Sequence, residues 1–156
     1  KVKNNPSLGL EKAKNYCFLL LKFRLRSEHE LLERLKNKKF DCQTSEKAVS
    51  FLKEKGFIDD KAFAKIWIES RIKKPLGLRR LTQELRVKGV DKEIIENQIE
   101  NIKHNYSEED AVREIVKKKL SKTKDIDPQK AKKRVYGYLL RRGFVAEAVI
   151  DVLDNV

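Results

Sequence analysis

Cysteine, methionine and long apolar runs are all scarce in this sequence. Its 156 residues include two cysteines and no methionine, even at position 1, so we expect the numbering to begin within a longer product. Cys17 and Cys42 match no metal-binding or redox spacing, which is typical of a reducing cytoplasm, and both are expected to be buried. The longest apolar run, Tyr16–Leu21, is far shorter than the roughly 20 residues that a membrane span needs. The sequence therefore predicts a cytoplasmic protein without a membrane segment.

Positive charge is in clear excess. The 37 lysines and arginines outnumber the 24 acidic residues and give a net charge of +13. Such a balance indicates a polyanionic or acidic partner, of which nucleic acid is the commonest. Because charged residues make up 39% of the chain, little apolar material is left for a thick core. An elongated helical protein fits this composition better than a compact globule.

Helix boundaries recur along the whole chain, with capping residues ahead of apolar stripes spaced three and four residues apart. They predict nine helices, and no strand or glycine-rich phosphate loop is expected. One helix ending occurs four times: a leucine, two further residues, a lysine or arginine, a glycine or lysine, and then an apolar residue. The four runs are Leu35–Phe40, Leu52–Phe57, Leu85–Val90 and Leu139–Phe144.

The spacing of these endings predicts an internal repeat. The first, third and fourth endings lie 50 and 54 residues apart, and each would end the middle helix of a triplet. We therefore predict an all-α fold: an elongated, solenoid-like array of three three-helix repeats over residues 10–56, 57–105 and 106–156. Arrays of this kind present an extended face to a partner.

The stretch from Lys55 to Val90 contains the only tryptophan and the densest run of arginines. A helix beginning near residue 78 would bury its leucines and leave Arg79, Gln83 and Arg86 on one outward face. The flat fork of arginine suits phosphates and carboxylates alike. This face is the first candidate for a binding surface.

An ordinary solvated helix face is the alternative, with Arg80 and Lys88 pairing with Glu84 one turn away. The wider charge pattern favours binding. From residue 117 to 142 there are eleven cations and two acids, whereas residues 91–110 contain seven acids and two lysines. Alternating blocks of charge indicate a patterned surface that faces a partner.

No constellation for catalysis, for a metal or for a cofactor is found, and nucleophile and Walker motifs are absent. Asp59 and Asp60 would diverge on a helix, and Asp59 is expected to be an N-cap. His29 and His104 have no partner ligands near them in the sequence, and Trp67 is expected in the core. The sequence predicts a protein that is not an enzyme and needs no cofactor.

Several spaced residues of the middle stretch, taken together, resemble the signature of RecX regulatory proteins. The residues that match are Gly56-Phe57-Ile58-Asp59-Asp60, Phe63-Ala64, Trp67-Ile68, Arg71, Gly77, Arg79-Arg80-Leu81, Glu84-Leu85-Arg86 and Lys88-Gly89-Val90. The threefold helix repeat extends the resemblance over nearly the whole chain. Lys39 departs from the pattern, because it stands where the repeat has glycine.

The resemblance implies a non-enzymatic modulator of the RecA recombinase in DNA repair and the SOS response. Family members bind RecA and its filament on single-stranded DNA, lie along the filament groove and usually suppress ATPase and strand exchange; some bind DNA directly. We expect a monomer that spans more than one RecA protomer. The predicted contact residues are Arg71, Lys73, Lys74, Arg79, Arg80, Arg86, Lys88, Lys132, Lys133, Arg134, Arg141 and Arg142.

Two other functions stay open. A basic helix-turn-helix-like protein could bind DNA directly through the helix from Leu78 to Lys88, with an affinity that falls steeply with salt. The N-terminal end of that helix lacks the cluster of Asn, Gln and Arg that would read bases, and Arg79 and Arg80 alone would bind phosphates as readily as guanine. An α-helical scaffold for another acidic protein would affect neither DNA nor RecA.

Overall fold

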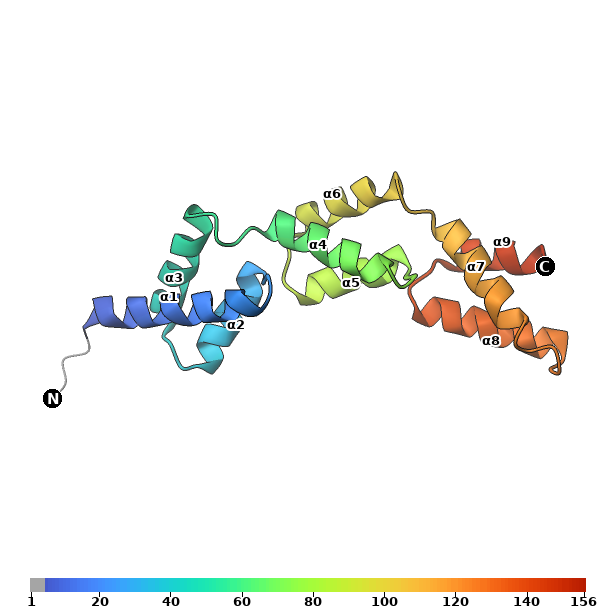
Figure 1. Ribbon diagram of the computed structural model, residues 1–156, viewed down its shortest axis with the longest axis horizontal. Coiled ribbons are helices and arrows are strands. Elements are labelled where there is room, and N and C mark those ends of the chain that lie inside the picture. Colours follow the sequence, from blue (N-terminus) through green and yellow to red (C-terminus); the bar gives the residue numbers. More distant parts are fainter. Residues whose placement is uncertain (1–4) are drawn as a thin grey trace. The chain divides into compact units, whose positions relative to one another are not determined.

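The computed structural model describes residues 5–156, and over these residues the chain forms nine α-helices and no strand (Figure 1). The helices are α1 (Pro6–Phe23), α2 (Glu28–Asn37), α3 (Cys42–Glu54), α4 (Asp60–Ile72), α5 (Leu78–Val87), α6 (Lys92–Lys103), α7 (Glu108–Leu120), α8 (Pro128–Arg141) and α9 (Ala146–Asp154). The predicted all-α class is confirmed. Among the described helices, none combines the length and apolar character needed to cross a membrane.

Side-chain caps determine where the helices begin. At α2 the Ser27 hydroxyl accepts the Glu30 N–H at 3.1 Å while the Glu30 carboxylate accepts the Ser27 N–H at 3.3 Å, which completes a capping box. Two helices begin earlier than their apolar stripes indicate. Asn5 caps α1 ahead of Pro6, and Asp41 caps α3. A cap satisfies amides of the first turn whether or not apolar residues follow at once.

The four repeated helix endings share one backbone geometry. In each, the N–H of the final apolar residue donates to the carbonyl of the leucine five residues earlier, at 2.9 to 3.2 Å. The residue just before it has a positive φ: 68° at Lys39, 77° at Gly56, 70° at Gly89 and 85° at Gly143. This is the Schellman ending. Lys39 is the one non-glycine residue with positive φ among the described residues.

The chain divides into two compact units, one formed by residues up to 66 with 85–94 and the other by residues 67–84 with 95–156. The division passes through α4, α5 and α6. In the first unit, α1 to α3 pack around a core that includes Leu31, Leu35 and Leu52. In the second, α7 to α9 pack around a core that includes Val112 and Leu139.

The prediction for the cysteines is half correct. Cys17 is fully buried, and burial raises the pKa of its thiol to about 11. Cys42 is exposed, contrary to the prediction. It is the first residue of α3, and at that position its Sγ faces solvent beside the Glu46 carboxylate at 3.5 Å.

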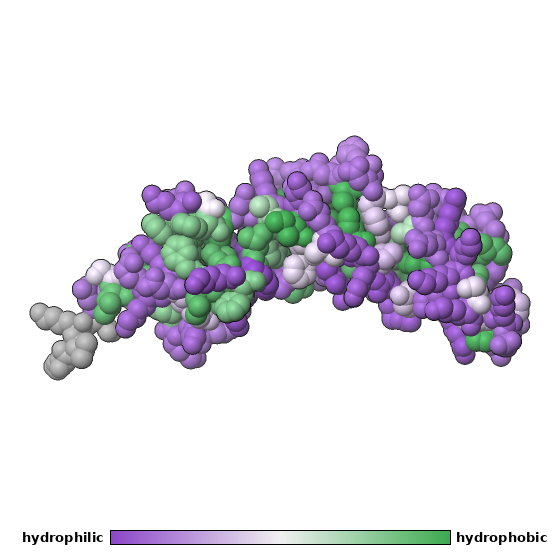
Figure 2. All heavy atoms as spheres, viewed as in Figure 1, coloured by the Kyte–Doolittle hydropathy of each residue, from purple (hydrophilic) through white to green (hydrophobic). Residues whose placement is uncertain are grey.

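The surfaces of the first and third repeats differ. On the face drawn in Figure 2, hydrophobic side chains gather over the first repeat, whereas hydrophilic ones cover most of the third. Leu19, Phe23 and Leu25 are among the exposed hydrophobic residues of the first repeat.

Candidate functional site

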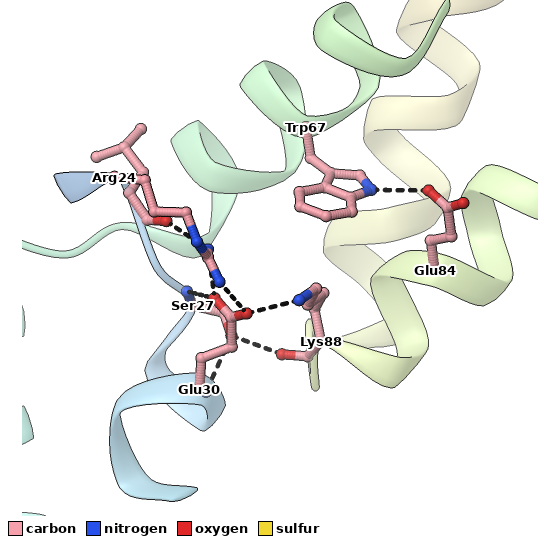
Figure 3. A network of polar contacts seen from close by, with 7 residues as sticks. Arg24, Ser27, Glu30, Trp67, Glu84 and Lys88 are labelled. Carbon is pink, nitrogen blue, oxygen red and sulfur yellow. Dashed lines mark hydrogen bonds and ion pairs between the residues drawn. The ribbon is translucent and has the colours of Figure 1, made fainter. Parts of the chain in front are cut away.

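Glu84 on α5 binds two of the predicted contact residues inside the second unit. Arg71 forms a fork with it, with Nε 2.9 Å from Oε2 and Nη2 2.7 Å from Oε1, and the Arg80 Nε lies 3.2 Å from Oε1. The indole N–H of Trp67 donates to Oε2 at 3.1 Å (Figure 3). Burial raises the pKa of Glu84, but these bonds outweigh burial and the net shift is downward. The pairing of Arg80 with Glu84, which belonged to the alternative interpretation of an ordinary solvated face, is confirmed, and both guanidiniums are engaged within the chain.

Lys88, a third predicted contact residue, is bound at the start of α2 within the first unit (Figure 3). Its Nζ lies 2.7 Å from Glu30 Oε1. The Arg24 guanidinium donates to both oxygens of the same carboxylate, at 2.8 and 3.0 Å. The Ser27 hydroxyl donates to the Lys88 carbonyl at 2.6 Å. Burial raises the pKa of Glu30, yet the bonds from Arg24 and Lys88 bring it down to about 2. We call this contact, between the start of α2 and the following repeat, the first joint.

Arg142 takes part in an equivalent contact within the second unit. The Gly77 N–H, just before α5, donates to the Arg142 carbonyl at 2.9 Å, as Ser27 does to the carbonyl of Lys88. The Arg142 guanidinium donates through Nε and Nη2 to the Pro75 carbonyl at 3.0 and 2.8 Å. We call this contact, between the start of α5 and the following repeat, the second joint.

A carboxylate caps the earlier helix at both joints. The Glu28 N–H at the start of α2 donates to Asp60 at 2.9 Å, and the Leu78 N–H at the start of α5 donates to Glu108 at 2.8 Å. Asp60 and Glu108 are the first residues of α4 and α7. Burial raises the pKa of both carboxyls, and the bond from the backbone N–H counteracts only part of that effect. Each joint thus satisfies a helix-start amide with an acid from the next repeat.

Glycines let the two backbones approach closely at both joints. A Cβ on Gly89 would lie 2.3 Å from the Cβ of His29, and a Cβ on Gly143 would lie 2.5 Å from the backbone nitrogen of Arg80. A Cβ on Gly77 would lie 2.0 Å from the carbonyl carbon of Gly143. Gly89 and Gly143 therefore end their helices and also make room for the preceding repeat. The sequence predicted only the first of these roles.

Lys132 of the predicted set is also bound within the chain. Its Nζ donates to the backbone oxygens of Leu153 and Val156 at 2.8 and 2.7 Å. These oxygens lie at the end of α9, where helix carbonyls lack partners. Lys132 therefore acts as a C-terminal cap for α9.

Seven of the twelve predicted contact residues remain exposed and form no ion pair with any residue of the described chain. They include two of the three residues of the predicted α5 face, whose third member, Gln83, is exposed as well. The seven are Lys73, Lys74, Arg79, Arg86, Lys133, Arg134 and Arg141. Within the predicted set, these seven are the residues whose side chains are left without an ion pair or a hydrogen bond among residues 5–156.

A basic cavity of about 300 Å³ opens beside the second joint. Its cations are Lys118, Lys119, Lys122 and Arg142, and Tyr138 supplies an aromatic wall. The three lysines are absent from the predicted contact set. Helical spacing could have found them, since Lys118 and Lys122 are four residues apart and would share a face of α7 continued by one turn.

The remaining candidates for chemistry have structural roles. Asp59 caps α4, as predicted, by accepting the Lys61 and Ala62 N–H groups at 2.8 and 3.4 Å. Trp67 is half-buried and hydrogen-bonded to Glu84 rather than enclosed in a core. Among residues 5–156, no group of three or more His, Cys, Asp or Glu side chains could hold a metal ion.

Comparisons with known proteins agree along the whole chain. Models for the first, second and third three-helix domains of RecX match residues 13–57, 59–97 and 107–153. Regulatory protein RecX of Amycolatopsis mediterranei is 38% identical over 89% of this chain and 79% of its own length. The protein of the same name from Caldanaerobacter subterraneus subsp. tengcongensis is 35% identical over 92% and 70%.

Solved structures share the fold. A crystal structure of RecX from Lactobacillus salivarius superposes with a TM-score of 0.82 at 16% identity, and the match covers 96% of this chain and 99% of that one. Another crystal structure of regulatory protein RecX gives a TM-score of 0.82 at 18% identity over 96% and 73%. Three tandem three-helix domains are therefore the architecture of this chain.

Proposed function

This chain belongs to the RecX family of regulatory proteins, and on that premise we propose that it binds RecA and the RecA filament on single-stranded DNA and inhibits its ATPase and strand exchange. The observation that carries the proposal is the match of all three family domains in order along one chain. Inhibition follows from contact: a chain lying in the filament groove competes with contacts between protomers or with DNA. It acts as a monomer in the cytoplasm, by binding and without catalysis.

The exposed cations support this proposal. Arg79 and Arg86 on α5 point to solvent without an ion pair among the described residues, so they are free to meet acidic groups of a partner. A charged group that is already solvated and unpaired contributes mainly to partner choice and association rate. Arg71 and Arg80, by contrast, would have to leave Glu84 first. We therefore assign the contacts of the middle repeat to Arg79 and Arg86.

ATP hydrolysis by the cognate RecA on single-stranded DNA tests the proposal directly. The protein is added at substoichiometric amounts at low and at near-physiological salt, where surface charges are screened within about 8 Å. We expect inhibition well below one copy per RecA at both salt concentrations. An effect that needs excess protein and vanishes with salt would mean that the protein merely covers the DNA.

A double charge reversal assigns the surface. Arg79→Glu with Arg86→Glu should raise the concentration needed for inhibition by about tenfold or more, while circular dichroism stays helical. The matched control is Lys12→Glu with Lys47→Glu, two exposed lysines of the first repeat with no ion pair among the described residues. Normal inhibition by the α5 variant, or an equal loss in the control, would contradict this assignment.

Direct DNA binding is a second candidate function. It is favoured by one observation, the basic cavity beside the second joint, whose cations have no carboxylate partner in the described chain. A protein that acts only on DNA would inhibit RecA solely by removing its substrate. Added single-stranded DNA would then restore ATP hydrolysis completely.

A further inference from the structure

We propose that the basic cavity binds a phosphate group. The cavity lies wholly within the second unit and is lined by Pro75, Glu114, Ile115, Lys118, Lys119, Lys122, Tyr138 and Arg142. This inference goes beyond the proposed regulation of RecA, because Arg142 is the only cavity residue that belongs to the predicted contact set. It concerns the chemistry of one site and stands whether or not RecA is the partner.

The lysines converge because of how α7 ends. The helix runs to Leu120, and the following turn keeps a nearly helical course, with the Ser121 N–H bonded to the Lys117 carbonyl at 3.1 Å and the Lys122 N–H to the Lys119 carbonyl at 3.1 Å. The side chains of Lys118 and Lys122 therefore project toward the same side. Three lysines within five consecutive residues therefore line one cavity.

Two cations of the cavity are held in place before any ligand arrives. The Lys119 Nζ lies 3.7 Å from the centre of the Tyr138 ring, a cation–π contact. The Arg142 guanidinium is fixed by its two bonds to the Pro75 carbonyl and lies 5.7 Å from the same ring. Cations whose positions are already set lose less conformational entropy when they bind a ligand.

Their charge is not neutralised within the chain. Pro75 contributes a neutral carbonyl, and none of the four cations forms an ion pair with any described residue. Glu114 is the single carboxylate on the cavity wall. Elsewhere in the chain, buried carboxylates such as Glu30 and Glu84 each collect two cations. The cavity is thus a place where positive charge has been left in excess.

A phosphate group is the ligand that this arrangement suits best. It carries more negative charge than a carboxylate and offers several acceptor oxygens to lysine and arginine donors that approach from different directions. A volume of about 300 Å³ admits the group with part of its attached sugar. The phosphate can belong to the backbone of single-stranded DNA or to a free nucleotide or pyrophosphate.

The test removes two cations that have no structural role. Lys118→Gln with Lys122→Gln changes two exposed side chains that bond to nothing else in the described chain, so the fold is retained. The matched control is Lys117→Gln with Lys124→Gln, which removes the same charge from exposed neighbours outside the cavity. Full-length chains are titrated with pyrophosphate by calorimetry and with labelled oligothymidylate by fluorescence anisotropy at several salt concentrations.

We expect the cavity variant to bind its ligand about tenfold or more weakly than the control. Loss of oligothymidylate binding alone, with a salt dependence reduced by about 0.7 per lost phosphate contact, identifies the DNA backbone as the source. Loss of pyrophosphate binding identifies a free phosphate compound. Equal losses in the cavity variant and the control, or no loss in either, would overturn the proposal.

Discussion

The two joints share a pattern of hydrogen bonds and differ in their charges. At each, the start of one helix donates to a backbone carbonyl beside a left-handed glycine and to an acid that opens the next repeat. In the first joint Lys88 shares the Glu30 carboxylate with Arg24. In the second the Arg142 guanidinium donates to the neutral carbonyl of Pro75 and forms no ion pair with any described residue.

The comparison distinguishes the contacts that form a joint from the charged side chains around it that can bind a partner. A hydrogen bond to a backbone carbonyl and a close glycine contact are common to both joints. The charged side chains around them can then vary. Where Glu30 and Arg24 surround Lys88, the network is internal. Arg142 forms no ion pair with any described residue, and its charge contributes to a basic cavity whose single carboxylate is Glu114.

The largest expected effect is that of a substitution that disrupts the backbone contact of the second joint. Gly77→Ala places a Cβ 2.0 Å from the carbonyl of Gly143, and neither backbone can move without opening the joint. We expect a loss of about 3 kcal/mol in the free energy of unfolding, the upper range for overpacking. Urea denaturation measures the loss, and hydrogen exchange at the start of α5 shows where it occurs.

Two glycine variants provide the scale for that result. Gly89→Ala at the first joint meets the side chain of His29 and adopts a positive φ, so we expect it to cost less, about 2 kcal/mol. Gly9→Ala in α1 meets nothing within 4 Å and should stabilise the helix by up to about 1 kcal/mol. A smaller loss for Gly77→Ala than for Gly89→Ala would show that the second joint yields more easily than the first.

Acid should weaken the first joint selectively. The pKa of Glu30 is about 2 in the folded chain against an ordinary value of 4.5, so its stabilisation is complete above pH 4.5 and is lost as the pH falls toward 2. Glu108 of the second joint has a raised pKa, so the folded state binds its proton more readily and acidification favours that joint. Hydrogen exchange at the start of α2 should therefore accelerate relative to the start of α5 below pH 4.5.

Glu30→Gln tests the cause of this acid sensitivity. The variant should lose about 2 kcal/mol at neutral pH, because Arg24 and Lys88 are left beside a neutral group. The acceleration of hydrogen exchange at the start of α2 in acid should disappear. The variant keeps Asp60, whose raised pKa has the opposite effect on stability in acid from the lowered pKa of Glu30. The matched control is Glu33→Gln, an exposed residue of the same helix that forms no ion pair with any described residue. If both variants behaved alike, the ion pairs of Glu30 would not explain the first joint.

The smallest expected effect tests whether glycine is needed at a left-handed helix ending that lies outside the joints. Lys39 ends α2 as Gly89 ends α5, with a φ of 68°, but its side chain is exposed. Lys39→Gly should therefore raise the free energy of unfolding by about 0.5 kcal/mol, because the left-handed strain of lysine exceeds the entropy cost of glycine. Thermal denaturation measures the gain. Lys38→Gly, one residue earlier at a φ of −81°, should instead destabilise the chain.

The sequence predicted the helices and their repeat because these depend on neighbouring residues. Caps such as Ser27 and Asp127 act within three or four residues. The repeated endings close a bond over five residues, so Gly89 and Gly143 could be recognised by spacing alone. The family resemblance relied on the same local motifs and is confirmed by all three domain matches.

The candidate site was predicted less completely, and the distance along the chain explains why. The spacing rule for helices found the pair Arg80 and Glu84, four residues apart. It could not show that Lys132 caps α9 from 21 residues away. Nor could it show that the Tyr138 ring lies against Lys119 from the preceding helix.

By itself, then, the sequence determined the nine helices, their threefold repeat and the excess of positive charge. The tertiary structure alone decided which cations are neutralised, because the partners of Lys88 and Arg142 lie 58 and 67 residues away in the chain. Periodicity specifies which face of a helix is apolar, whereas the pairing of charges depends on how adjacent repeats dock. That docking requires glycines at close backbone contacts, a property that appears only when two distant segments are brought together.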